Sequence, residues 1–162
     1  MCGVNKPIER MKPGQRRKLT DGEVAVGRTI FAAEIDWPRV RVLQGPSLGF
    51  GAMVPLGRTI LFSTWRAPYD FSDAPLDEQG WFVHELMHVW QAAHGTFLAA
   101  AKLRALGKLA YAYTPKPHAC LKHYNIERQA EIARHLFLTR SGSEANLPPR
   151  EWLEDVWASR FG

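Results

Sequence analysis

Residues 81–91 have the sequence Trp-Phe-Val-His-Glu-Leu-Met-His-Val-Trp-Gln, which contains the pattern His-Glu-x-x-His. Residues four apart lie on one face of an α-helix, so the imidazoles of His84 and His88 can point at a single ion. The stretch 76–94 has helical spacing and stops at Gly95, as is typical of a helix C-terminus. The helix also has an apolar face turned away from the two histidines, formed by Val83, Leu86, Met87 and Trp90.

This pattern predicts a metal site with a base beside it. Imidazole nitrogens are suitable ligands for zinc. Glu85 is rotated by about 100° from His84 on the helix, so it lies beside the ion and not on it. That is where a general base for a metal-bound water belongs. The alternative is that the two histidines are buried or surface residues that bind no ion.

The third ligand must come from another element, because a catalytic zinc site has three protein ligands and an open position. His94 lies too near on the same helix to converge with His84 and His88. Glu127 and Glu131 stand four apart on one face of a helix predicted over 125–140. One carboxylate can bind the ion, and the other can accept a hydrogen bond from a zinc-bound histidine. Alternatively, both are surface charges that pair with Arg128, Arg134 or His135.

Other side chains between these two helices could stabilise the negative oxygen that forms when a peptide carbonyl is attacked. His123 and Tyr124 rank first, because they lead directly into the Glu127 helix. Tyr111, Tyr113 and His118 are further candidates, and each of the five can instead be structural. Trp81 precedes His84 by three residues on the same helix, so it can border the cleft.

The remaining pattern predicts one α+β domain, with an N-terminal helix and a small sheet followed by the two metal-site helices and a C-terminal helix. Thr20 and Glu23 form a capping-box pattern at the start of the first helix. The strand over 59–64 can present an extended peptide to the metal if it lies at a sheet edge. The other expected elements are helices over 21–34, 97–113 and 149–160 and a strand over 39–43.

Length and composition are those of a globular protein. The chain has 162 residues, of which 46% are hydrophobic, and we expect no disulfide framework from its two cysteines. No apolar run is long enough to span a membrane, and the N-terminus lacks the apolar core of a signal peptide. We therefore expect a cytoplasmic protein, or one exported by an apparatus that needs no signal peptide.

The net charge of +5 is concentrated at the N-terminus. Residues 1–20 hold six of the 21 basic residues and one of the 16 acidic residues, so the rest of the chain is neutral. We predict a flexible basic tail over 1–18 and a folded domain over 19–162. Nucleic acid is an unexpected partner, because the predicted domain has no net basic charge.

The two motifs together resemble those of the gluzincin metallopeptidases. His-Glu-x-x-His at 84–88 is followed by Glu-x-x-Ala-Glu at 127–131. The resemblance implies a zincin-like fold in which His84, His88 and Glu127 bind Zn²⁺. It also implies that Glu131 supports one of the histidines.

A closer resemblance covers most of residues 19–140. The segments that carry it are Leu19–Glu23, Pro75–Asp77, Phe82–Gln91 and Glu127–Phe137. They are similar to the bacterial Vgr-related proteins and to the metallopeptidase-like core domain found beside extracellular contractile injection systems. This resemblance implies a component of an injection or secretion apparatus with a peptide or protein substrate.

The expected activity is therefore zinc-dependent peptide hydrolysis, with Glu85 as the general base for a zinc-bound water. The alternative is a non-catalytic scaffold or adaptor of such an apparatus, which keeps the metal site only as a structural element. Glu85 distinguishes the two, because a scaffold needs metal ligands but no base.

Overall fold

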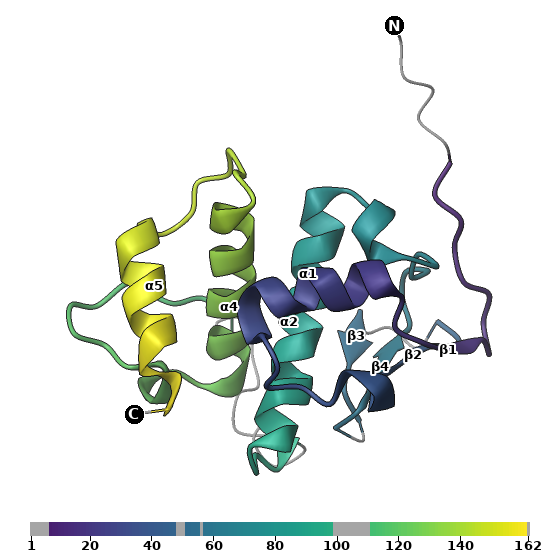
Figure 1. Ribbon diagram of the computed structural model, residues 1–162, viewed down its shortest axis with the longest axis horizontal. Coiled ribbons are helices and arrows are strands. Elements are labelled where there is room, and N and C mark those ends of the chain that lie inside the picture. Colours follow the sequence, from purple (N-terminus) through teal and green to yellow (C-terminus); the bar gives the residue numbers. More distant parts are fainter. Residues whose placement is uncertain (1–6, 48–50, 56, 99–110, 162) are drawn as a thin grey trace, which may run out of the picture.

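A four-stranded sheet lies at one end of the molecule in the computed structural model, which describes residues 7–47, 51–55, 57–98 and 111–161 (Figure 1). The strand order is β1 (Arg16–Lys18), β2 (Arg41–Gln44), β4 (Thr59–Phe62) and β3 (Ala52–Met53). Strands β2 and β4 are parallel, and the two outer pairs are antiparallel. Alternate side chains of β2 and β4 are buried, which is the period-two pattern that predicted strands here.

The helices begin and end close to where the sequence predicts. They are α1 (Asp21–Phe31), α2 (Leu76–Ala93), α4 (Ile126–Arg140) and α5 (Arg150–Ala158), with short 3-10 turns at Trp37–Arg39, Phe71–Asp73, Leu121–His123 and Ser159–Phe161. The capping box is formed, since the backbone N–H of Glu23 donates to Thr20 Oγ1 at 3.0 Å and the Thr20 N–H donates to the Glu23 carboxylate at 3.0 Å. Most of the helix predicted over 97–113 lies outside the described residues, and the part at 111–113 is not helical. None of the described helices has both the length and the apolar character to cross a membrane.

Helices α2 and α4 pack side by side and form the centre of the molecule, with α5 on the outer side of α4 and α1 crossing both (Figure 1). The close approach of α2 and α4 depends on small residues. A Cβ on Gly80 would lie 3.2 Å from Leu138, and Ala130 and Ala133 are fully buried. The sheet is joined to α2 by an aromatic stack, in which the Phe71 ring lies 4.7 Å from Phe82. The prediction of a single α+β domain is therefore confirmed.

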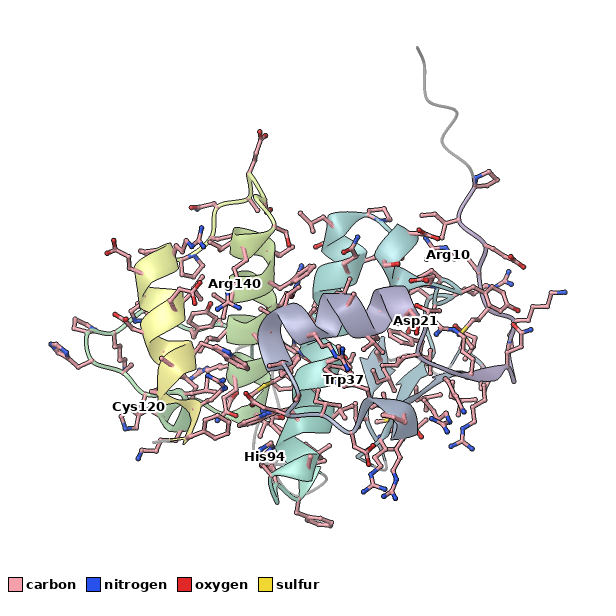
Figure 2. All side chains as sticks on the ribbon, viewed as in Figure 1. Arg10, Asp21, Trp37, His94, Cys120 and Arg140 are labelled. Atoms are coloured by element: carbon pink, nitrogen blue, oxygen red, sulfur yellow. The ribbon has the colours of Figure 1, made fainter. Side chains whose placement is uncertain are left out.

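The N-terminal segment corrects the predicted tail. Residues 1–6 lie outside the described residues, but β1 pairs with β2 and Met11 is fully buried. Arg10 donates two hydrogen bonds to Glu78 on α2, at 2.7 and 2.8 Å, on the side of the molecule where the strands lie (Figure 2). The prediction of a flexible tail is wrong for residues 10–18, because β1 belongs to the sheet and because Arg10 and Arg17 form ion pairs with Glu78 and Glu23.

Replacing Arg17 by alanine is expected to destabilise the domain by about 3 kcal/mol. Arg17 forms two hydrogen bonds of 2.7 Å to Glu23, whose side chain is 0% exposed, so the variant would leave a buried carboxylate without its cation. Urea unfolding measures the loss. The neighbouring exposed Arg16 provides the matched control, since its replacement by alanine should change the free energy of unfolding by less than about 0.5 kcal/mol. Equal losses in the two variants would contradict this assignment.

Candidate metal centre

Helices α2 and α4 bring together two imidazoles and one carboxylate. His84 and His88 lie one turn apart on α2 and are 2% and 0% exposed. The Oε2 atom of Glu127, in the first turn of α4, lies 3.3 Å from His84 Nε2 and 3.2 Å from His88 Nε2. One ligand atom from each of the three residues lies within 4.8 Å of the others. The three residues that come together are those that the resemblance to gluzincins implied as metal ligands.

The position of Glu127 is set by the start of α4. Asn125 caps this helix, since its side-chain oxygen accepts the backbone N–H of Arg128 at 2.8 Å. The cap places Glu127 in the first helical turn, where a carboxylate interacts favourably with the helix dipole. Ala130 is fully buried between α4 and its neighbours, so the first turn of α4 comes close to the histidines of α2.

Each of the two histidines also has a hydrogen-bond partner at its other ring nitrogen, Nδ1. The Nδ1 atom of His84 lies 2.8 Å from Glu131 Oε1, and that of His88 lies 2.8 Å from Gln91 Oε1. When each Nδ1 donates to its partner, the lone pair of each Nε2 faces Glu127. Glu131 therefore stands where the sequence placed the supporting carboxylate, and its partner is His84.

Gln91 is a residue that the sequence reasoning missed. Its side-chain amide donates to the Ile126 carbonyl at 3.0 Å and to Gln129 at 2.9 Å, so it also fixes the start of α4. The available signal was its position three residues after His88, on the same side of the helix.

The electrostatics of the cluster favour a positive charge. Burial lowers the pKa of His84, but hydrogen bonds to Glu127 and Glu131 and the charge of Glu85 outweigh it and raise this pKa to about 9. Burial raises the pKa of Glu131, whereas the hydrogen bond to His84 and the charges of His84 and Arg134 lower it below its ordinary value. A metal cation bound by His84, His88 and Glu127 would also supply positive charge to this cluster.

The donor spacing also fits a small ion. Two atoms that each lie about 2.1 Å from a tetrahedral ion are ~3.4 Å apart. The corresponding distances here, from Glu127 Oε2 to the two Nε2 atoms, are 3.3 and 3.2 Å. Two imidazoles and one carboxylate could therefore hold a divalent ion of the zinc type and leave a fourth position open.

Glu85 provides the carboxylate beside these donors. It is 5% exposed, and its buried Oε2 makes no hydrogen bond within the described residues. A buried carboxylate oxygen without a partner is costly, which indicates a position suited to a ligand or a proton. Together with His84 and Glu127, Glu85 lines a cavity of about 450 Å³, which we call the metal cavity.

Several segments of the chain line the metal cavity. Strand β3 contributes Ala52, and the chain after β4 contributes Trp65. The Trp81 ring lies 5.3 Å from that of His84, so Trp81 borders the cavity as expected. Tyr111, which is 47% exposed, also lines the cavity, with its ring 5.9 Å from that of His84. Strand β4 is not an edge strand, because it lies between β2 and β3.

The expectation that His123 and Tyr124 line the metal cavity is wrong. The Tyr124 hydroxyl lies 3.5 Å from the Thr114 carbonyl, and its ring packs edge-on against Trp152. The ring of His123 accepts the backbone N–H of Cys120 at 3.1 Å, and Cys120 lies beside α5 (Figure 2). Both side chains line a separate cavity, together with residues of the segment 112–119. Of the tyrosines proposed from the sequence, Tyr111 is the one that lines the metal cavity.

Comparison with known proteins reveals a relative. No family model matches the chain. The chain is 34% identical over 134 residues to VgrG2b of Pseudomonas aeruginosa PAO1, a type VI secretion system spike protein. The solved structure of the VgrG2b effector domain superposes with a TM-score of 0.69 at 28% identity, covering 91% of this chain and 84% of that domain. The chain is homologous to the VgrG2b effector domain.

This homology confirms the resemblance to Vgr-related proteins. The match covers 77% of this chain but only 13% of VgrG2b, so it concerns one domain of a much longer spike protein. The binding of zinc and the peptidase activity stay predictions.

Proposed function

We propose that this chain is a zinc-dependent peptidase that acts at the metal cavity. One observation carries the proposal: the ligand atoms of His84, His88 and Glu127 converge beside a buried Glu85 oxygen that has no hydrogen-bond partner in the described residues. A structural site needs the three ligands and closes its fourth position with another one. A carboxylate oxygen that lies beside the ligands and has no hydrogen-bond partner in the described part of the chain favours catalysis.

Zinc is the proposed ion because the donors are two imidazole nitrogens and a carboxylate oxygen. His84, His88 and Glu127 would hold it. When bound, zinc acts as a Lewis acid that acidifies a water molecule and polarises a carbonyl group.

Glu85 is the general base in this proposal. Its carboxylate takes the proton from the attacking water and delivers it to the amine that leaves. Because its Oε2 has no partner among the described residues, the base does not have to break an existing hydrogen bond at that atom. Its burial excludes bulk water from the proton transfer.

Tyr111 is the proposed donor to the developing negative oxygen. Burial and the charges of Glu127 and Glu85 raise the pKa of its hydroxyl above the ordinary value. The hydroxyl therefore stays protonated at neutral pH and can donate a hydrogen bond.

The peptide would bind along β3. Among the described residues β3 pairs only with β4, and Ala52 of β3 lines the metal cavity. An extended peptide can add to such an edge through backbone hydrogen bonds.

The homology supports a link to a type VI secretion apparatus. We propose that this chain is exported by, or together with, such an apparatus and needs no signal peptide. An epitope-tagged chain should then appear in the culture medium of its source bacterium only when the contractile apparatus is intact. Release that is independent of the apparatus would contradict the proposal.

The activity is tested with the purified zinc-loaded protein and an unfolded protein substrate such as denatured casein. We expect new peptide termini by mass spectrometry, loss of cleavage with a chelator and recovery with zinc. If the chain binds one zinc ion per molecule but cleaves no peptide in a broad library, the catalytic proposal fails. The scaffold alternative would then account for the site.

Replacing Glu131 by alanine is expected to weaken zinc binding by about 10- to 100-fold, because His84 loses the carboxylate that orients its ring. Competition with a chromogenic chelator measures the affinity. Glu144→Gln is the control, because Glu144 is exposed in the loop after α4. Unchanged affinity in Glu131→Ala would show that this hydrogen bond does not support the metal site.

A further inference from the structure

Two cavities share the same aromatic walls. The metal cavity is lined by Trp65 and Trp81, and a second cavity of about 550 Å³ is lined by the same two tryptophans together with Arg10, Arg66 and Glu78. The two cavities border the same two rings, and we refer to them together as the groove. We propose that this groove selects peptides with a bulky aromatic side chain next to the bond presented to the metal centre. This inference rests on the proposed function and specifies its substrate class.

The walls of the metal cavity are rigid. The Trp65 ring lies 4.8 Å from Phe62 and 6.1 Å from Phe71, in edge-on contacts that fix its plane. The Trp81 ring lies 5.3 Å from the His84 ring, and the guanidinium of Arg134 stands 4.1 Å from the centroid of the Trp81 ring. Preformed aromatic walls bind an aromatic side chain with little loss of conformational entropy.

Charge in the groove disfavours acidic side chains. The carboxylates of Glu85 and Glu127 line the metal cavity and would repel an acidic side chain. One face of the Trp81 ring is already covered by Arg134. An uncharged ring avoids this repulsion and gains contact with Trp65 and Trp81.

The far end of the groove is polar and fixed. Arg10 forms its ion pair with Glu78 there, and Arg66 donates to the Met11 carbonyl at 2.8 Å. These contacts hold the N-terminal segment against the loop after β4, so this segment builds one wall of the groove. A groove that continues past the aromatic walls to a polar end suits an extended peptide better than a small molecule.

The test measures binding without cleavage. The zinc-loaded Glu85→Gln variant is titrated with fluorescein-labelled decapeptides of Ala, Ser and Gly that carry Phe, Trp, Ala, Glu or Lys at one central position. We expect Phe and Trp peptides to bind about 10- to 100-fold more tightly than the Ala peptide. Trp65→Ala and Trp81→Ala, each made in the same background, should each reduce this preference to less than about threefold. Trp152→Ala, which removes a tryptophan from α5, should preserve it.

The outcomes separate this inference from the proposed function. Melting temperature and zinc content identify a variant that has failed to fold. If one of the two variants Trp65→Ala and Trp81→Ala fails to fold, the peptide preference of the other one tests the inference. Aromatic preference that survives both Trp65→Ala and Trp81→Ala overturns the inference, as does equal binding of all five peptides. Failure of the wild type to cleave an aromatic peptide that it binds would instead overturn the peptidase proposal and leave the groove assignment standing.

Discussion

Glu85→Gln is expected to reduce peptide hydrolysis by about 10²- to 10⁴-fold, which is the usual contribution of a general base. Glutamine has nearly the same shape but cannot take a proton from water. Because Glu85 stands beside the metal donors and is not one of them, bound zinc and thermal stability should stay close to those of the wild type. Initial rates of cleavage of a quenched fluorescent peptide measure the effect.

The control for this variant is Glu144→Gln, which makes the same chemical change at an exposed position. Its cleavage rate should equal that of the wild type. A Glu85→Gln variant that binds zinc and cleaves at the wild-type rate would exclude Glu85 as the base, although not the metal site itself.

Removal of the metal is expected to lower the melting temperature by about 10 °C. Without the metal ion, the carboxylates of Glu85, Glu127 and Glu131 stay buried together with no divalent cation to balance them. A ligand present at about 1,000 times its Kd stabilises the folded state by about 4 kcal/mol, and each kcal/mol shifts the melting temperature of a domain of this size by about 2–4 °C. Thermal unfolding with zinc and with excess chelator measures the difference.

The matched control for chelation is the His88→Ala variant, which lacks one ligand. Its melting temperature should respond little to zinc or chelator, because it no longer holds the ion tightly. If the wild type unfolds at the same temperature with and without zinc, the ion does not bind the folded state in the way proposed here.

The helices could be predicted because their signals are local. The Thr20–Glu23 capping box, the spacing of apolar residues around His84 and the glycine after α2 depend only on neighbours in the sequence. The same periodicity placed His84 with His88, and Glu127 with Glu131, on common helical faces. The choice of Glu127 over Glu131 as the ligand came from the resemblance to gluzincins, since helical spacing alone does not distinguish the two.

The features that the sequence did not predict depend on contacts between distant segments. The position of Tyr124 next to the Glu127 helix ranked it above Tyr111, but of these two tyrosines only Tyr111 lines the metal cavity. Gln91 acquires its role from contact with the start of α4. The sequence of the basic N-terminal segment is typical of a solvated arm. In the structure, Glu78 and Glu23 supply counter-charges to this segment.

The most direct test of the metal site is elemental analysis of protein purified without added metal, on the wild type, Glu127→Ala and Glu144→Gln. Among the described residues, Glu127 is the one whose carboxylate contacts both histidine Nε2 atoms. We predict about one zinc ion per chain in the wild type and in Glu144→Gln, and little or none in Glu127→Ala. Absence of metal from the wild type even after zinc is offered, or equal zinc in Glu127→Ala, would contradict the proposed site.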